Sequence, residues 1–380
     1  MREEQHSFGL TAVAVAMVLG AGCALDETPE PVRSEPEIVI TPRRVDTAGR
    51  TFAPPAPCLG PRCETVVEVA SGRAHTCALM SSGRVVGWGS GDGAPREVPG
   101  LHDAIALAAG GDRSCAVRSG GTVWCWDGAV SPAARVSGVD DAVTVAVSDE
   151  LVVAARGDGT LVNVSRGRDA EVLRGARGIV EVDVAGPRAC ARTDGGDVAC
   201  WLAGDSHVTP LALANVRQIA MGDAHQCVLV AGAEVRCWGE DVWGMVGLGV
   251  AGIVEEPTPV SDVRGALAIA AGKEHTCALL PGTQVRCWGR NHRGQVDPSR
   301  RAFDDYWAER TPVAVSGLSA VRDVVMVSPG SQHTCALRAR GGIVCWGANR
   351  EGQLGDGSVE TRDGVVEVRG LRGGRSSRVE

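Results

Sequence analysis

Residues Ala270 to Gly289, which read A-A-G-K-E-H-T-C-A-L-L-P-G-T-Q-V-R-C-W-G, contain the pattern that decides the fold. Two short apolar segments, His275 to Leu279 and Gln284 to Trp288, flank a Pro-Gly turn, and their cysteines lie ten residues apart. Short apolar segments separated by Gly and Pro are typical of β-hairpins. Two further apolar segments, Pro259 to Val263 and Ala266 to Ala270, complete a predicted unit of four strands.

This unit occurs seven times in the 380-residue chain. Successive anchor positions are 38, 38, 37, 37, 50 and 58 residues apart, and they are Cys77, Cys115, Val153, Cys190, Cys227, Cys277 and Cys335. Six units have a tryptophan eleven residues after the anchor, and unit three is degenerate. A period near 40 residues that is filled by four short strands predicts the blades of a β-propeller. A β-solenoid, the alternative, usually has shorter coils without two hairpins.

The two ends of the repeat region predict how the ring closes. Unit one begins at Val66 without a first strand, and Val365 to Leu371 resembles the first strand of a unit, as in Val313 to Leu318. We therefore expect the C-terminal strand to complete the first blade, so that no sheet edge stays open. The predicted fold is an all-β, seven-bladed propeller of four-stranded antiparallel blades over residues 64–371, with a tail at 372–380.

The best-preserved repeat resembles a known family. Residues 341 to 357 read G-G-I-V-C-W-G-A-N-R-E-G-Q-L-G-D-G, which is similar to the regulator of chromosome condensation repeat. The resemblance covers most of the chain, is clearest in units six and seven, and implies a seven-bladed propeller. It also implies a protein-binding role, because eukaryotic nuclear members exchange guanine nucleotides and one secreted bacterial type inhibits β-lactamase.

The cysteine spacing predicts disulfides within the hairpins. Two cysteines ten residues apart, with the turn midway, face each other across an antiparallel pair, at a distance that a disulfide spans. Each bridge would close 11 residues and stabilise the fold by about 2.7 kcal/mol. The five expected pairs are Cys115–Cys125, Cys190–Cys200, Cys227–Cys237, Cys277–Cys287 and Cys335–Cys345.

Units one and three depart from this cysteine pattern. Unit three has Val153 and Asn163 at the two positions, and the loss of both cysteines together is what a bonded pair predicts. In unit one Cys77 faces Gly87, so its expected partner is Cys58 or Cys63, just upstream of the first blade.

The N-terminus predicts export. An apolar run from Phe8 to Ala21 is too short for a comfortable membrane span and leads into L-G-A-G-C, which resembles a bacterial lipobox. We expect residues 1–23 to be a signal peptide with Cys23 as the lipidated residue, and residues 24–63 to be a proline-rich acidic tether. The expected location is the bacterial outer membrane or cell surface, with membrane contact only through the lipid. A cleaved secretory signal, giving a periplasmic or secreted protein, is the alternative, and fourteen cysteines agree with either.

Composition and motifs exclude several function classes. The net charge of −8, without basic clusters, argues against nucleic acid as a partner. No catalytic constellation is recognisable, so we expect neither an enzyme nor a cofactor. Four histidines precede a cysteine by two residues, but they recur once per blade and cannot converge on one metal. We interpret them as structural groups that tie their strand to the adjacent turn: His75, His225, His275 and His333.

Three long loops predict a binding face. Gly239 to Glu256, Gly289 to Arg310 and Gly347 to Asp363 follow the same strand of units five, six and seven. The expected contact residues are Trp243, Met245, Phe303, Tyr306 and Trp307, since aromatic side chains commonly anchor interfaces. The alternative is that they pack the loops onto their own blades. The sequence thus predicts a monomeric, non-enzymatic propeller that binds a protein at the cell envelope. An intracellular exchange or regulatory propeller and a carbohydrate-binding or structural surface protein remain alternatives.

Overall fold

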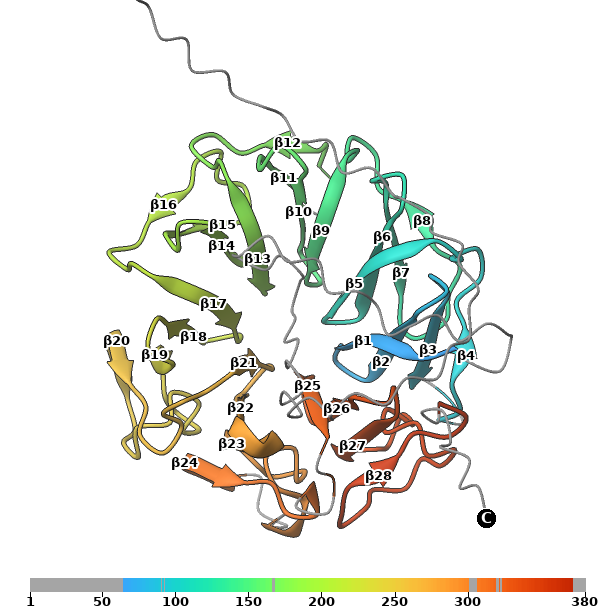
Figure 1. Cartoon of the computed structure of the whole chain (residues 1–380), viewed down its shortest axis with the longest axis vertical. Coiled ribbons are helices and arrows are strands. Elements are labelled where there is room, and N and C mark those ends of the chain that lie inside the picture. The colour runs from blue at the N-terminus through green and yellow to red at the C-terminus, as the bar shows by residue number, and fades with distance from the viewer. Residues whose placement is uncertain are drawn as a thin grey trace, which may run out of the picture. The chain divides into compact units, whose positions relative to one another are not determined.

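The computed structural model describes residues 64–371, apart from residues 90, 92, 166–167, 301–305, 319–320 and 322. Seven four-stranded antiparallel sheets surround a common centre (Figure 1), which confirms the predicted seven-bladed propeller. The two helical elements in this part of the chain are single 3-10 turns, η1 (Pro281–Thr283) and η2 (Pro298–Arg300). None of the described helices is long and apolar enough to cross a membrane. The predictions for the leader, the tether, Cys23, Cys58, Cys63, Phe303 and the tail lie outside the described residues.

Each blade is a simple meander, in which four consecutive strands pair with their chain neighbours from the centre outwards. The innermost strands are β1 (Val66–Ser71), β5 (Ala104–Gly110), β9 (Ala142–Val147), β13 (Ile179–Ala185), β17 (Val216–Met221), β21 (Ala268–Ala271) and β25 (Val324–Pro329). The second strands are β2 (His75–Met80), β6 (Arg113–Arg118), β10 (Leu151–Arg156), β14 (Arg188–Thr193), β18 (His225–Val230), β22 (His275–Leu280) and β26 (His333–Arg338). The third strands are β3 (Val85–Gly89), β7 (Val123–Asp127), β11 (Leu161–Ser165), β15 (Val198–Leu202), β19 (Glu234–Glu240), β23 (Gln284–Arg290) and β27 (Ile343–Gly347).

The outermost strands complete the blades and differ in length. Five have two residues: β4 (Arg96–Glu97), β8 (Ala134–Arg135), β12 (Glu171–Val172), β16 (Thr209–Pro210) and β28 (Val366–Glu367). Two have seven residues: β20 (Ile253–Pro259) and β24 (Ala308–Ala314). Both long strands contain prolines, which have no N–H group: Pro257 and Pro259 in β20, and Pro312 in β24. Because proline cannot donate a ladder hydrogen bond, these edges are poor templates for pairing with another chain.

The hydrophobic core lies between blades. The second strand of a blade has neighbours on both of its faces, so all six residues of β2 and of β22 are buried. This explains why each of these strands, after an initial buried His-Thr pair, continues as an unbroken apolar run. One core cluster joins Leu229 and Val246 of blade 5 to Ile269 and Trp288 of blade 6. Each blade is therefore stabilised chiefly by its neighbours in the ring.

The predicted mode of ring closure is wrong. The C-terminal strand β28 pairs with β27 through Cys345↔Val366 and Val344↔Glu367, so it completes the last blade and not the first. The first blade supplies its own outer strand, β4. The same shift of one strand places Pro259 in the outer strand of blade 5, where the sequence suggested the start of unit six. A periodic sequence does not reveal where its unit begins, because either division gives seven copies of every strand.

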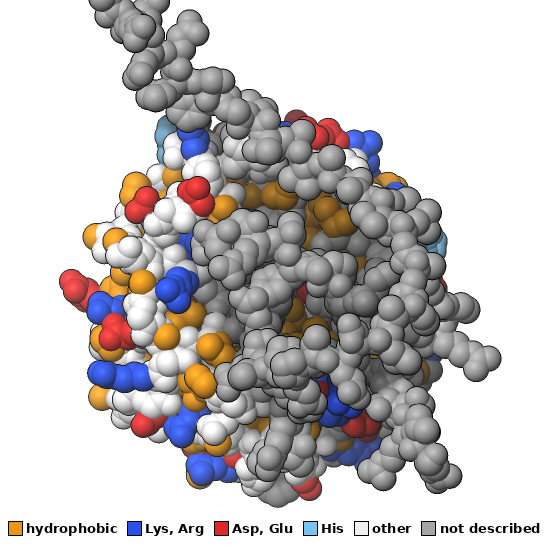
Figure 2. Space-filling view, in the orientation of Figure 1, with side chains coloured by type: hydrophobic (Ala, Val, Ile, Leu, Met, Phe, Trp, Pro, Cys, Tyr) orange, Lys and Arg blue, Asp and Glu red, His pale blue; other side chains and the backbone are white. Residues whose placement is uncertain are grey.

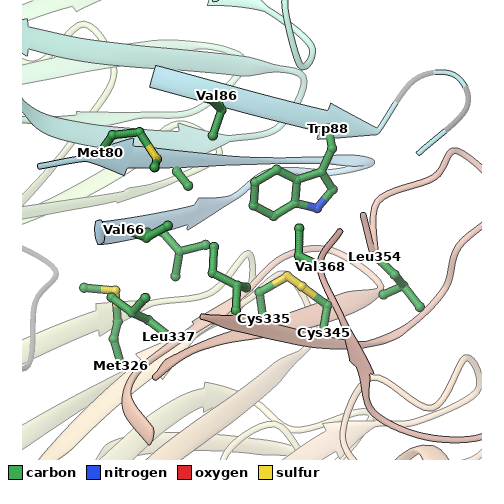
Figure 3. Packing of buried hydrophobic residues seen from close by; sticks show 13 residues of the cluster. Val66, Met80, Val86, Trp88, Met326, Cys335, Leu337, Cys345, Leu354 and Val368 are labelled. Carbon is green, nitrogen blue, oxygen red and sulfur yellow. A yellow bond between two sulfur atoms is a disulfide. The ribbon is translucent and has the colours of Figure 1, made fainter. Parts of the chain in front are cut away.

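Side-chain packing closes the ring between blades 7 and 1. Figure 3 shows Trp88 and Val66 of blade 1 facing Leu337, Leu354 and the Cys335–Cys345 disulfide of blade 7. The Ser71 hydroxyl donates to the Ser328 carbonyl at 2.9 Å, and the Ser328 hydroxyl accepts the Ser71 N–H at 2.9 Å. The first and last blades are thus joined by a core like that between other neighbouring blades.

Candidate functional site

Five of the seven blades contain a disulfide between their second and third strands. The pairs are those that the spacing predicts, and each cysteine lies directly opposite its partner, as in Cys277↔Cys287. The two Cα atoms of each pair are 4.0 to 4.1 Å apart. Blade 3 has the same register without the sulfurs, since Val153 faces Asn163. The disulfides therefore follow from hairpin geometry, one blade at a time.

Cys77 is a free, fully buried thiol, and it faces Gly87. A Cβ atom at Gly87 would lie 2.0 Å from the Ala129 carbonyl oxygen, so backbone from blade 2 fills the space of a second cysteine. Burial raises the pKa of Cys77 to about 12, although hydrogen bonds from Ser114 and Trp126 oppose this shift. At neutral pH the group is a protonated thiol, which is a poor nucleophile.

The four repeated histidines join neighbouring blades. Their Nε2 atoms share hydrogen bonds with hydroxyl groups of the next blade around the ring, at 2.7 to 2.8 Å: His75 with Ser114, His225 with Thr276, His275 with Thr334 and His333 with Thr76. The prediction that each histidine ties its strand to its own adjacent turn was therefore wrong about the partner. The hydrogen bond crosses a blade interface, which sequence spacing alone does not show.

The ring of each histidine lies against a glycine three residues earlier. A Cβ atom at Gly72 would be 2.3 Å from the His75 ring, and one at Gly222 would be 2.0 Å from the His225 ring. The G-x-x-H pattern thus reflects the space that the imidazole needs. Burial lowers the histidine pKa, to about 4 for His75 and to about 3 for the other three. These histidines are neutral at pH 7.

The long loops of blades 5, 6 and 7 fold over the next blade. In each loop one backbone carbonyl accepts two hydrogen bonds, one from a threonine hydroxyl and one from a tryptophan N–H of that blade. Gln295 O, for example, accepts from Thr334 Oγ1 at 2.8 Å and from Trp346 Nε1 at 2.9 Å. The equivalent carbonyls are Met245 O, which accepts from Thr276 and Trp288, and Gln353 O, which accepts from Thr76 and Trp88.

These bonds also fix the tautomer of His225, His275 and His333, whose partners are threonines. The threonine hydroxyl uses its one hydrogen for the loop carbonyl, so it must accept from the histidine Nε2–H. The remaining ring nitrogen, Nδ1, has no partner in His225, His275 and His333. A second proton on this ring would therefore be buried without an acceptor.

The third residue of each loop holds its turn. Asn291 Oδ1 accepts the N–H of Val296 at 2.9 Å, Asn349 Oδ1 accepts that of Leu354 at 3.0 Å, and Asp241 Oδ1 accepts that of Val246 at 2.8 Å. Met245, within the blade 5 turn, is 2% exposed. Its predicted role as a partner contact is wrong, because the turn points this side chain into the core, and its carbonyl faces Trp288.

An exposed aromatic patch lies beyond these turns. It comprises Val242, Trp243, Val250, Tyr306 and Trp307, from the loops that follow β19 and β23. The exposed fractions are 75% for Tyr306 and 42% for Trp307, and Val242 and Val250 are about half exposed. The rings of Trp243 and Tyr306 are 5.8 Å apart at their centroids. Three of the five predicted contact residues thus meet at one place, across two blades.

Two arginines support this patch from below. The Arg290 guanidinium lies 4.6 Å from the centre of the Trp243 ring and pairs with Glu274 at 2.8 Å. Arg310 donates to the carbonyls of Val242 at 3.1 Å and Asp241 at 3.3 Å, and Gly249 donates to the Arg310 carbonyl at 2.9 Å. The sequence reasoning missed both supporting roles, although Arg310 lies in one of the loops that it singled out. A partial signal was present, because W-G is followed by Glu240-Asp241 in blade 5 and by Arg290-Asn291 in blade 6.

The central cavity offers no comparable site among its described residues. The innermost strands line it mainly with Ala, Gly, Val and Ser. Its charged side chains are committed to contacts between blades: Glu68 accepts the N–H of Leu107, Asp183 accepts that of Met221, and Lys273 pairs with Asp223 at 3.5 Å. No group of three or more His, Cys, Asp or Glu residues in the described chain could hold a metal ion. On the part of the face in Figure 2 that is not grey, charged side chains of both signs are interspersed.

Comparison with known proteins identifies the class. The fold is similar to that of Prp20p from Saccharomyces cerevisiae, with a TM-score of 0.60 and 19% identity over 70% of this chain and 81% of that one. It is also similar to the ectodomain of the receptor kinase ACR4 from Arabidopsis thaliana, with a TM-score of 0.50 and 16% identity over 75% and 96%. The chain is thus a propeller of the fold seen in Prp20p.

The sequence comparison agrees with the structural one. The regulator of chromosome condensation (RCC1) repeat model matches residues 66–92, 267–295 and 321–353. The human E3 ubiquitin-protein ligase HERC2 is 27% identical over 227 residues, which are 55% of this chain and 5% of HERC2. The matched region is therefore a small part of that relative. Three of the seven blades of this chain thus match the regulator of chromosome condensation repeat.

Proposed function

We propose that this chain is a non-enzymatic, protein-binding propeller of the bacterial cell envelope, which binds as a monomer through the aromatic patch. The observation that carries the proposal is the exposure of Tyr306 and Trp307 beside Trp243 and Val242. Contiguous exposed apolar side chains commonly mark interaction sites, and aromatic residues next to arginine dominate their binding energy.

The framework beneath the patch supports this use. Arg290 and Arg310 hold the loop of blade 5 against blade 6 through the ring stacking and the carbonyl contacts described above. The N–H of Asp241 donates to the Gly252 carbonyl at 2.7 Å and closes the base of that loop. A preformed surface loses little conformational entropy when a partner binds.

The relatives support a protein partner in general terms. Prp20p has been characterised for its binding to Gsp1p and histones, and HERC2 is a ubiquitin ligase many times longer than this chain. These likenesses also favour the second candidate, an intracellular exchange or regulatory propeller. Location separates the two, because stable hairpin disulfides are expected outside the cytosol.

Export is supported by the disulfides, by the lipobox-like residues around Cys23 and by the use of this fold in an ectodomain. The test is intact mass spectrometry of the native protein before and after reduction. We expect cleavage before Cys23, a diacylglycerol-containing mass increment and a gain of ten hydrogens from the five hairpin bridges. A full-length chain with reduced thiols would favour the intracellular candidate.

Binding through the patch is tested with a photo-crosslinking amino acid at position 306. The matched control places the same residue at Leu202, which is half exposed in blade 4, away from the patch. We expect a discrete crosslinked protein from envelope extract at position 306 and none at 202, and loss of this product when Trp307→Ala is added. Equal products at both positions, in folded protein, would contradict the proposal.

A further inference from the structure

The aromatic patch adjoins an acidic rim. The rim comprises Glu240, Ile253 and Glu255, at the base of the blade 5 loop. Glu240 lies directly opposite Ile253 in the β19–β20 pair, and Glu255 follows Ile253 by two residues in the same strand. Cross-strand partners share one face of a sheet. Val254 packs into the core between blades 5 and 6, so Ile253 and its partner Glu240 point away from it. Glu255 lies at the register shift that follows Val254 and is exposed.

The rim and the patch form one continuous surface. Glu240 precedes Val242 by two residues, so their Cα atoms are within about 7 Å. The hydrogen bond from Asp241 to Gly252 holds the two ends of the loop together at the rim. Ile253 is 74% exposed, the largest value among apolar residues of this blade. The surface therefore presents apolar side chains beside two carboxylates.

The charges on this surface are unbalanced. Glu240 and Glu255 are exposed and form no ion pair within the described chain. Of the nearby arginines, Arg290 pairs with Glu274, and Arg300 pairs with Asp297 and Glu309. Arg310 donates to neutral loop carbonyls and keeps its charge, which offsets one of the two carboxylates. Arg236 lies opposite Pro259, at the other end of β20, and pairs with Glu234. The surface that a partner meets is thus apolar and negative.

Resting on the proposed function, we propose that the partner is a cationic protein segment, in which lysine or arginine residues flank an aliphatic or aromatic side chain. The apolar side chain packs against Val242, Ile253 and Tyr306, and the basic residues face Glu240 and Glu255. Complementary charge accelerates association and excludes partners of the wrong sign. The same sign disfavours nucleic acid and anionic lipid as occupants of this surface.

The test is a selection from a random twelve-residue peptide library displayed on phage, with the purified propeller as bait. The propeller carrying Tyr306→Ala and Trp307→Ala serves for counter-selection. We expect enriched peptides to carry lysine or arginine on both sides of an apolar residue. Their Kd should rise at least tenfold for Glu240→Lys/Glu255→Lys, and should rise with salt because exposed charges are screened.

A matched control and two contrary outcomes complete the test. Glu171→Lys changes an exposed acid on the outer strand of blade 3 and should alter the Kd less than twofold. Enriched peptides that need the patch but are neutral or acidic would overturn the cationic partner and leave the proposed function standing. If the peptides bind the counter-selection variant equally well, or if no peptide is enriched over it, both the cationic partner and the proposed function are overturned. Unchanged thermal unfolding of each variant shows that the fold is intact.

Discussion

The blades on one side of the ring are joined by polar contacts that the other side lacks. The interfaces from blade 5 to 6, 6 to 7 and 7 to 1 each have a histidine–threonine bond and a loop carbonyl that accepts a tryptophan N–H. Between blades 2, 3 and 4 the corresponding positions are Arg113 and Val152, then Leu151 and Ala189. The indole N–H of Trp201 in blade 4 finds no acceptor there.

This difference explains the structural role of the matched repeat pattern. The matched repeats, 66–92, 267–295 and 321–353, are blades 1, 6 and 7, which all lie at interfaces of the first kind. The recurring G-x-x-H-T and N-x-x-G-Q elements are the two halves of a link between neighbouring blades. Blade 4 uses another link, in which Glu181 pairs with Arg192 at 2.7 Å and accepts the Ile219 N–H of blade 5.

The largest expected effect is acid sensitivity of the histidine-linked side. The unfolded histidine pKa is about 6.5, and the folded values are about 4 for His75 and about 3 for His225, His275 and His333. Between these values the unfolded state binds more protons, so stability is complete above pH 6.5 and is lost as the pH falls. Four histidines give a slope of up to about 5 kcal/mol per pH unit. The raised folded pKa values of Glu181, about 7, and Asp241, about 6, reduce this slope at lower pH, because both carboxyls bind protons in the folded state. Urea unfolding between pH 7.5 and 5 measures this slope. His275→Gln removes one titrating group and should reduce the slope by up to about 1.4 kcal/mol per pH unit.

The next effect separates the buried turn from the exposed patch. Met245→Ala should lower the free energy of unfolding by about 2–5 kcal/mol, because it leaves a cavity in the core. Tyr306→Ala, in the same pair of loops, should change it by less than about 0.5 kcal/mol. Urea midpoints measure both. A large loss for Tyr306→Ala would mean that this ring supports the fold and is not held for a partner.

Blades 1 and 3 give opposite predictions for an added disulfide. Val153→Cys with Asn163→Cys should form a sixth bridge and stabilise the fold by about 2.7 kcal/mol, because the two residues face each other across the hairpin. Gly87→Cys should leave Cys77 unbonded and destabilise the fold, because the Ala129 carbonyl occupies the site. Thiol titration with and without reductant, together with thermal unfolding, checks both; a bridge at Cys77 would refute the packing argument.

The smallest effect compares two tryptophans. Trp346→Phe removes an N–H that donates to Gln295 O, whereas Trp201→Phe removes one that has no acceptor. Both changes lose similar volume from a buried site, so the difference isolates the hydrogen bond. Trp346→Phe should cost about 1 kcal/mol more. Equal losses in denaturant unfolding would show that the loop carbonyl contributes little to the link.

The sequence predicted local features well and relations between blades poorly. The cysteine pairs and the turn at Gly282 followed from spacing within one hairpin, and the three long loops followed from the length of chain after each W-G. The histidine partners and the supporting role of Arg310 could not be predicted in this way, because they join residues 39 to 257 positions apart. Three of the five predicted patch residues meet in space, but Met245 is turned into the core by a loop conformation that Asp241 fixes.

The sequence by itself determined the seven repeats, the four strands of each and the register that brings five cysteine pairs together. Those features depend on strand alternation and turn position, which are encoded within about ten residues. Only the tertiary structure decided that the last strand stays in the last blade, that Ala129 denies Cys77 a partner and that loops link one blade to the next. These outcomes depend on which surfaces pack together around a closed ring, and no local pattern specifies that.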